Sequence, residues 1–304
     1  MDLTFAKLIV NPAAGAGKTA REWPGLLAHL KNSGLKFDYD LTESPGHAVA
    51  LAREALLKGY ELIVAVGGDG TVNEVVNGLY GDGVEKNVLI GIISTGTGSD
   101  LIRTLGIPRS PFEACRCLLS PRKITVDIGM VEYMKGGWPI NRLFVNFAGV
   151  GIDAEIVKAT TQRFKKLGDK PSYFAGLLAT ILSYRNVETA IKLDGETVNK
   201  KVCEVLVCNG KYAGGSMLVA PSADPSDGYF DVMTIREMGK MELLRCFPTI
   251  YKGTHVNNPK VEMNRAREIE INPARPLPLQ ADGELLGETP VKIRIIPKAI
   301  NVAV

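Results

Sequence analysis

Short apolar runs alternate with amphipathic segments over roughly the first 130 residues of this chain. The strand-like runs lie at residues 8–10, 36–42, 61–66 and 88–93, and the helix-like segments at 22–32, 47–58 and 71–79. Gly34, Gly59 and Gly81 close these helices. Nearly continuous apolar strands separated by helices are typical of a parallel sheet that is covered on both faces. The pattern therefore predicts an α/β, doubly wound first domain.

After about Asp127 the strand-like runs change to a two-residue alternation of apolar and polar side chains, as in residues 291–296. The predicted strands are 143–148, 190–193, 202–208, 229–235, 268–271 and 291–296, with helices near 153–165, 173–184 and 239–251. This alternation is the signature of half-buried antiparallel strands. A chain of 304 residues is also long enough for two domains. We expect an α/β domain over 1–128 and a mainly antiparallel β-sandwich domain over 129–304.

Composition narrows the class of protein. A net charge of +3 is too weak to indicate nucleic-acid binding, although it is compatible with an anionic membrane surface. No apolar stretch reaches the length of a spanning helix, and the start of the chain lacks the basic residues of a signal peptide. The five cysteines are odd in number and lie mostly in apolar runs, which favours reduced core residues. We expect a cytoplasmic protein.

The stretch from Asn11 to Thr19, NPAAGAGKT, ends like the phosphate loop of a P-loop nucleotide hydrolase. That motif requires a glycine five residues before Gly17, where this chain has Pro12. Proline fixes φ and has no N–H group to donate. The phosphate loop must therefore lie elsewhere.

A better phosphate loop follows the apolar run 61–66, at Gly67-Gly68-Asp69-Gly70. Glycines let backbone amides approach a bulky anion, and a helix that begins at Thr71 would add free N–H groups. Thr71 and Glu74 have the spacing of a capping box. Because bare phosphate would repel Asp69, the acid points to Mg²⁺ between the two. The alternative is a tight turn that merely needs glycine.

A second strand, loop and helix follow at residues 91–101, where Thr95 and Thr97 could donate hydroxyl groups to phosphate. Asp100 lies in the first turn of the next helix, and Asp127 ends a further strand. Loops at the carboxyl ends of neighbouring parallel strands converge on one crevice. Together these acids resemble a carboxylate cluster around a metal, although Asp100 could simply favour a helix start and Asp127 a turn.

Two acidic turns interrupt the second half. Asp282-Gly283-Glu284 has the form of an ordinary hairpin turn. The turn from Asp224 through Asp227 to Tyr229 is rich enough in oxygen to hold a cation, and is equally compatible with a simple turn.

Taken together, these motifs resemble the diacylglycerol kinase catalytic domain family, in particular its soluble bacterial lipid kinases, which are similar to sphingosine and ceramide kinases. The matching features follow one another in family order over nearly the whole chain. They are Asn11-Pro12, Thr42, Gly46-His47-Ala48, Gly67 to Thr71, Gly96-Thr97, residues 146–153, Ala220-Pro221, residues 227–231 and Asp282-Gly283-Glu284. The resemblance implies an active site between the two domains, and it allows the last strands to return towards the first domain.

The resemblance also implies ATP and Mg²⁺ as cofactors, with a role for each group of residues. The residues that would contact ATP are Asn11, Thr42, Gly67, Gly68, Asp69, Gly70, Thr71, Val72, Asn73 and Thr97. Asp69, Asp100 and Asp127 would organise Mg²⁺ through water, and the turn of Asp224, Asp227 and Tyr229 would hold a structural Mg²⁺. Glu284, with Asp282 beside it, would accept the proton of a lipid hydroxyl. Ser99 departs from the family, which has asparagine there, but serine could still cap the helix.

The resemblance implies a membrane lipid as substrate, most simply diacylglycerol, reached by peripheral contact at the inner membrane surface. Residues 163–182 place basic side chains beside an apolar helix, which suits such contact, although a core helix would read the same way. A sphingoid base, ceramide, phosphatidylglycerol, other lipid alcohols and a homodimer all stay open. The alternative functions are an NAD kinase, which shares the diglycine-aspartate loop, and a nucleotide-binding or lipid-binding regulator without catalysis.

Overall fold

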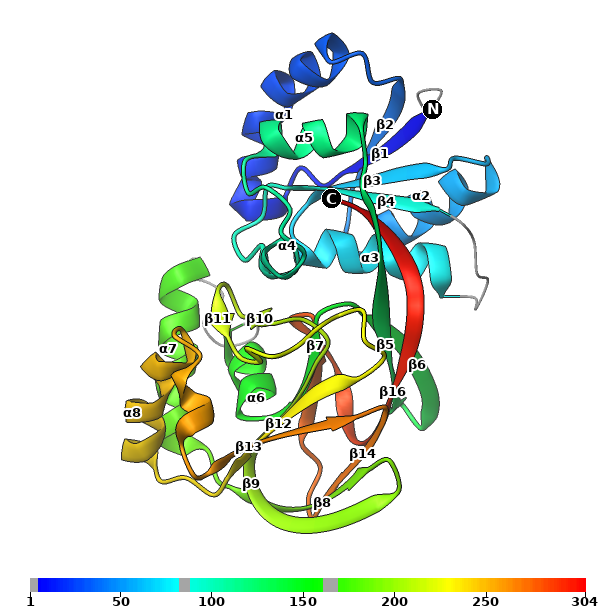
Figure 1. Cartoon of the computed structure of the whole chain (residues 1–304). Coiled ribbons are helices and arrows are strands. Elements are labelled where there is room, and N and C mark those ends of the chain that lie inside the picture. Colours follow the sequence, from blue (N-terminus) through cyan, green and yellow to red (C-terminus); the bar gives the residue numbers. More distant parts are fainter. Residues whose placement is uncertain (1–4, 82–87, 161–168) are drawn as a thin grey trace. The chain divides into compact units, whose positions relative to one another are not determined.

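The structure, a computed structural model, describes residues 5–81, 88–160 and 169–304, with the side chains of 169–174 left out. The chain divides into two compact units (Figure 1). Unit 1 comprises residues 1–128 and 297–304, and unit 2 comprises residues 129–296. The predicted boundary left 297–304 with the second domain, whereas the structure groups these last residues with unit 1.

Unit 1 alternates strands and helices. Its elements are β1 (Ala6–Val10), α1 (Ala14–Asn32), β2 (Phe37–Leu41), α2 (His47–Leu57), β3 (Leu62–Gly67), α3 (Asp69–Tyr80), β4 (Leu89–Ser94), α4 (Asp100–Leu105) and α5 (Pro111–Leu119). The strands are parallel in the order β2-β1-β3-β4. Residues 301–302 of the last strand extend this sheet beside β4. The predicted α/β domain is confirmed.

The strand order places a topological switch point in unit 1. From β1 the chain moves outward to β2 and then crosses to β3 on the other side of β1. Open α/β sheets bind ligands beyond the carboxyl ends of their strands at such a point. The loops after β1 and β3, which carry Asn11 and Gly68, lie at that edge of the sheet.

Unit 2 is mainly antiparallel. Its elements are β5 (Lys123–Lys135, which begins in unit 1), β6 (Trp138–Phe144), β7 (Phe147–Gly151), α6 (Ile152–Lys158), α7 (Asp169–Ser183), β8 (Val187–Leu193), β9 (Glu196–Cys208), β10 (Tyr212–Ala213), β11 (Met217–Leu218), β12 (Phe230–Arg236), α8 (Lys240–Ile250), a 3₁₀ turn (Thr254–Asn257), β13 (Val261–Ala266), β14 (Glu268–Pro273), β15 (Pro278–Ala281) and β16 (Glu284–Ala303, which ends in unit 1). Strands pair in the order β13-β12-β9-β7-β15-β16, and β8 and β14 join β9 to β16. The predicted antiparallel β domain is confirmed.

Two apolar clusters hold unit 2 together. One lies among the strands, where the rings of Phe144 and Phe230 stack with centroids 5.6 Å apart. The other lies between the sheet and the helices α6, α7 and α8, and includes Cys203 and Leu206 of β9. Burying both faces of β9 explains why its second half, from Val202 to Cys208, is nearly continuous in apolar residues. All five cysteines are free thiols.

Some predicted boundaries were wrong. The helical segment that contains the predicted helix 22–32 spans Ala14–Asn32, but Gly15, Ala16 and Gly17 have left-handed φ values of 61°, 53° and 78°, so the regular helix starts after Gly17. The strand predicted at 143–148 is two strands, β6 and β7, interrupted at Val145 and Asn146. Asp127 lies inside β5 and does not end a strand.

Within the described ranges, no helix is both long enough and apolar enough to cross a membrane. The basic half of the segment predicted to contact a membrane, with Lys165 and Lys166, lies outside the described residues.

Candidate active site

Three loops of unit 1 meet at glycines that leave no room for a side chain. A Cβ atom added at Gly15 would lie 2.7 Å from the carbonyl oxygen of Thr95, and one at Gly96 would lie 2.5 Å from the Cα of Gly68. A Cβ on Gly67 would lie 2.3 Å from the hydroxyl of Thr71. The structure thus brings the loops after β1, β3 and β4 together, because close backbone approach requires glycine there.

Asn11 links the first two of these loops. Its Nδ2 donates to the hydroxyl oxygen of Thr71 at 3.0 Å, and its Oδ1 accepts from the amide of Ala13 at 3.0 Å. Beside it, the hydroxyl groups of Thr19 and Thr95 are 2.5 Å apart in a buried contact. Asn11 is therefore held in place at the switch point of the sheet, where the sequence predicted a nucleotide contact.

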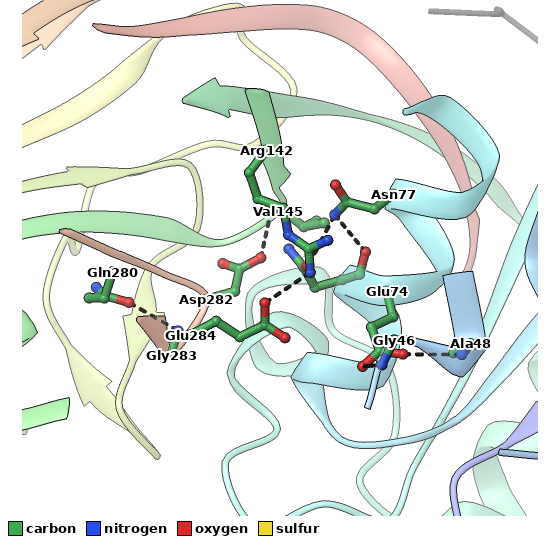
Figure 2. Close-up of polar contacts among 11 residues, drawn as sticks. Gly46, Ala48, Glu74, Asn77, Arg142, Val145, Gln280, Asp282, Gly283 and Glu284 are labelled. Carbon is green, nitrogen blue, oxygen red and sulfur yellow. Dashed lines mark hydrogen bonds and ion pairs between the residues drawn. The ribbon is translucent and has the colours of Figure 1, made fainter. Parts of the chain in front are cut away.

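The start of α3 differs from the predicted capping box. The helix begins at Asp69, after the N-cap residue Gly68, and no side chain of the described residues caps it. Glu74 instead accepts hydrogen bonds from the amides of Gly46 at 2.9 Å and Ala48 at 3.1 Å, and so caps α2 (Figure 2). The capping-box prediction was wrong because Glu74 meets these donors in another helix. The N-terminus of α3 keeps an uncapped set of amides of the kind that binds phosphate.

Asp69 caps a neighbouring helix. Its two carboxylate oxygens accept hydrogen bonds from the amides of Asp100 and Leu101, each at 3.2 Å, at the start of α4. Ser99 does not cap that helix as predicted: it has a left-handed φ of 57°, and its hydroxyl lies 2.7 Å from that of Ser94. Asn adopts this conformation more readily than Ser, which gives the departure from the family a local physical cost.

The three acids predicted to organise Mg²⁺ differ in access to solvent. Asp69 is partly exposed, whereas Asp100 and Asp127 are buried. Asp127 Oδ1 accepts a hydrogen bond from the amide of Lys298 at 2.6 Å, within unit 1. In the described part of the chain, no group of three or more His, Cys, Asp or Glu side chains is gathered for a metal ion. A water-mediated network stays a prediction, and Asp69 is the member best placed to accept a water ligand.

The other predicted ATP contacts fall into two sets. Thr97 is exposed, and Gly68 and Gly70 are partly exposed, so a ligand can reach them. Thr42 is partly exposed after β2, and its amide donates to Val10. The side chains of Thr71, Val72 and Asn73 are buried.

The acidic turn of unit 2 is a two-residue hairpin. Asp282 and Gly283 have φ values of 47° and 83°, and the flanking Ala281 and Glu284 pair across the strands β15 and β16. Positive φ at both central residues is the type I′ turn for which Asp-Gly is a preferred sequence.

The Asp282 carboxylate anchors this turn. Its Oδ2 accepts from the amide of Val145 at 2.8 Å (Figure 2). Its Oδ1 accepts from the amides of Asn146 and Phe147 at 3.0 Å each. Two of these amides lie in the break between β6 and β7, and the third belongs to the first residue of β7. The continuous strand predicted there was wrong because the backbone bends to direct three donors at Asp282.

Glu284 is the more accessible acid of the turn. Its side chain is 40% exposed, and Oε2 forms an ion pair with the Arg142 guanidinium at 2.9 Å (Figure 2). Arg142 comes from β6, and sequence reasoning missed it because a single arginine in a β-strand carries no motif. The structure therefore offers a carboxylate that is oriented by a cation and open to solvent.

The turn predicted to hold a structural Mg²⁺ already contains a cation. Asp227 pairs with Arg265 through Oδ2 and accepts from the amide of Tyr229 at 3.0 Å through Oδ1. The guanidinium groups of Arg265 and Arg267 lie 4.6 and 4.3 Å from the Tyr229 ring centroid. In this arrangement the residues do not fit a further cation, because Arg265 neutralises the carboxylate that would bind it. We derive no role for a metal at this turn.

Two family models match successive parts of the chain. The diacylglycerol kinase catalytic domain matches residues 6–131, and the YegS C-terminal NAD kinase beta sandwich-like domain matches residues 146–304. The diacylglycerol kinase of Staphylococcus aureus (strain bovine RF122 / ET3-1) is 30% identical over 300 residues, which are 98% of this chain and 91% of that protein.

Solved structures agree with this assignment. A crystal structure of a "putative diacylglycerol kinase" from Bacillus anthracis str. Sterne is 25% identical to this chain. It has a TM-score of 0.80 over 99% of this chain and 95% of that chain. Yeast NADH kinase complexed with NADH, at 12% identity, has a TM-score of 0.55 over 100% of this chain and 83% of that chain, which shows a shared fold alone. The chain therefore belongs to the diacylglycerol kinase catalytic domain family, with a YegS-like C-terminal domain, and is a kinase of that family.

Proposed function

We propose that this protein transfers the γ-phosphoryl group of ATP to the free hydroxyl of diacylglycerol in a Mg²⁺-dependent reaction. Membership of the kinase family implies ATP as the donor. Relatives that bear the name diacylglycerol kinase support that lipid as the acceptor. The observation that carries the proposal is the exposed Glu284 carboxylate, held by Arg142 on an anchored turn.

The glycine-rich loop of unit 1 would bind the phosphates of ATP. The uncapped N-terminus of α3 directs amides and a positive helix dipole outward from Gly68, and Asn11 and Thr97 lie on the adjoining loops. Asp69 would hold Mg²⁺ through a water ligand, and the ion would neutralise charge on the phosphates. Phosphoryl transfer needs such positioning and neutralisation more than covalent chemistry from the protein.

Glu284 would accept the proton of the attacking hydroxyl. Arg142 fixes the direction of the carboxylate, and one of its oxygens, Oε1, has no ion-pair partner within the described ranges. Asp282 is less suited to this task because three backbone amides already occupy its oxygens. We therefore assign proton transfer to Glu284 and positioning to Asp282, which sharpens the pairing implied by the family resemblance.

Peripheral membrane contact would supply the lipid. On unit 2, α7 exposes Leu178 and Leu182, and α8 with the residue after it exposes Met241 and Tyr251. Exposed apolar side chains of this size, close in sequence to basic residues such as Arg245, suit an interface with anionic lipid. A higher rate on vesicles that contain anionic lipid would support this contact, whereas equal rates on neutral vesicles would count against it.

The test is a panel of lipid alcohols in mixed micelles with labelled ATP, with NAD as a control acceptor, for the wild type and Glu284→Gln. Removing the base should lower kcat by about 10²-fold to 10⁴-fold and leave ATP affinity unchanged. Glu288→Gln is the matched control, because Glu288 is an exposed acid on the same strand. A Glu284→Gln protein with the wild-type rate would exclude Glu284 as the base. Labelling of NAD alone, with no lipid labelled, would contradict the lipid kinase assignment.

A further inference from the structure

We propose that Gln280, Asp153 and Glu204 form a positioning chain that fixes the turn carrying Glu284, in addition to the anchor made by Asp282. The chain lies wholly in unit 2 and acts through the backbone of Gly283 without touching substrate. It rests on the proposed function for its effect on catalysis, since Glu284 is the proposed base.

Gln280 connects the turn to the first turn of α6. Its Oε1 accepts a hydrogen bond from the amide of Gly283 at 3.0 Å (Figure 2), and its Nε2 donates to Asp153 Oδ2 at 2.6 Å. The Gln280 side chain is only 1% exposed. A backbone N–H can only donate, so Gly283 fixes which end of the Gln280 amide is oxygen. The Nε2 atom must then face Asp153.

This orientation locates a proton. Asp153 Oδ2 accepts from Gln280, and Asp153 Oδ1 accepts from the amide of Ala154 at 2.5 Å, so both oxygens act as acceptors. Glu204 Oε2 accepts from the Asp153 amide at 2.9 Å, whereas its Oε1 is buried without a hydrogen-bond partner among the described residues. A charged Glu204 would leave that buried oxygen without a donor, whereas both oxygens of Asp153 have one. We therefore place the proton of this pair on Glu204 and the charge on Asp153.

Burial supports this assignment. Glu204 is 2% exposed, and desolvation, reinforced by the Asp153 charge, raises the pKa of its carboxyl well above the usual value. Desolvation also raises the pKa of Asp153, although hydrogen bonds from Gln280 and from the Ala154 amide oppose that shift. The protonated member of the pair is thus the one with fewer donors around it.

The backbone of β7 and β9 is shaped to admit the pair. A Cβ atom on Gly149 would lie 1.9 Å from Asp153 Oδ2, and one on Gly151 would lie 3.0 Å from Glu204 Oε2. Gly149 pairs directly with Gln280 across β7 and β15. The pairing of β9 with β12 shifts register between Glu204 and Val202, where a bulge can redirect a side chain. The glycines of residues 149–153 therefore accommodate a polar chain that ends at the proposed catalytic turn.

The proposal predicts a rescue when the polarity of the chain is reversed. In Gln280→Glu, the new carboxylate accepts from Gly283 but faces Asp153 with no donor. In Asp153→Asn, one oxygen replaces two acceptors, so either Gln280 Nε2 or the Ala154 amide loses its acceptor and faces an NH₂ group instead. In the double variant, the introduced asparagine donates to the introduced glutamate, which still accepts from Gly283, so the chain is complete again.

The experiment measures kcat, the KM for ATP and backbone amide exchange of residues 280–286 in the wild type, both single variants and the double variant. Each single change should lower kcat about tenfold or more at unchanged KM for ATP, because small displacements of a catalytic group are costly. Exchange at the turn should rise by a similar factor. The double variant should recover most of both losses. Asn199→Asp, an amide-to-acid change at an exposed position of β9, is the matched control and should behave as wild type.

Losses in the double variant that equal the product of the single losses would overturn the proposal. Single variants in which the backbone amides of the turn exchange as in wild type would also overturn it. A uniform rise of amide exchange over unit 2 would overturn it too, because that result indicates general destabilisation. The exchange arm needs no substrate, so it decides the positioning chain even if no lipid is phosphorylated. Glu284→Gln, measured in the same assay, tests the proposed base separately.

Discussion

The two units treat their acidic side chains differently. In unit 1, Asp69 and Glu74 accept pairs of backbone amides, and both cap helices other than the one on which they lie. In unit 2, Asp282 also binds amides, but the buried Glu204 accepts the Asp153 amide on one oxygen and has no hydrogen-bond partner among the described residues on the other. Amide donors satisfy a carboxylate without a counterion, whereas a buried carboxyl that lacks donors must keep its proton.

The difference has a consequence for function. An acid that binds amides fixes backbone, and the loops joined in this way in unit 1 carry the predicted ATP contacts. The carboxyl pair fixes a side chain, Gln280, which in turn holds the amide of Gly283. Each variant below removes one kind of anchor, in order of decreasing expected effect.

The largest loss of stability is expected for Asp282→Ala. Three amides lose their acceptor, and alanine must adopt the left-handed φ of 47°. Together these changes should lower the free energy of unfolding by about 3 to 5 kcal/mol, because each unsatisfied buried donor costs about 1 to 3 kcal/mol. Urea unfolding measures this free energy. Asp282→Asn keeps one acceptor and the turn conformation, so its loss should be smaller; equal losses would mean that the amide contacts contribute little.

A smaller loss is expected for Asp69→Asn. Asparagine keeps one acceptor for the start of α4 but removes the charge that favours a helix N-terminus. The free energy of unfolding should fall by about 1 kcal/mol, and Glu74→Gln should show a similar loss at α2. If Asp69 also holds Mg²⁺ through water, kcat should fall far more in Asp69→Asn than in Glu74→Gln. Equal kcat values in the two variants would show that Asp69 caps α4 and has no role in holding Mg²⁺.

The smallest change in the free energy of unfolding is expected for Glu204→Gln at low pH, because glutamine imitates the protonated acid. Because burial raises the folded-state pKa of Glu204, the folded chain binds more protons than the unfolded chain above about pH 4.3, and stability falls as the pH rises towards the raised pKa. Glutamine removes this loss. Asp153 contacts Glu204, the charge of an ionised Glu204 acts on Tyr184, Cys203 and Cys208, and burial raises the pKa of all four groups.

The check is the urea midpoint measured at intervals from about pH 5 to about pH 8. The Glu204→Gln protein should match wild type at the acidic end and exceed it increasingly towards the alkaline end. Parallel curves would show that Glu204 is charged in the folded protein and would move the proton to Asp153.

The sequence by itself determined the fold class and the family. Continuous apolar runs specified buried parallel strands in unit 1, alternation specified antiparallel strands in unit 2, and Asp282-Gly283 specified a tight hairpin. These features are local, since side-chain periodicity and the φ preference of glycine act within a few residues. The motifs that carried the resemblance were also readable without a structure.

Only the tertiary structure decided which groups the acids meet. Asp69 caps a helix 31 residues away, Gln280 reaches Asp153 across 127 residues, and Asp282 reaches Val145 across 137 residues. For this reason the capping box at Glu74, the Ser99 cap and the unbroken strand at 143–148 were wrong, and Arg142 was missed. Glu204 carried one signal, a charge inside the apolar run from Val202 to Cys208. Its meaning depended on a partner that only chain folding brings within hydrogen-bond distance, because a polar group in a low-dielectric interior is stabilised by its spatial neighbours and not by its neighbours in sequence.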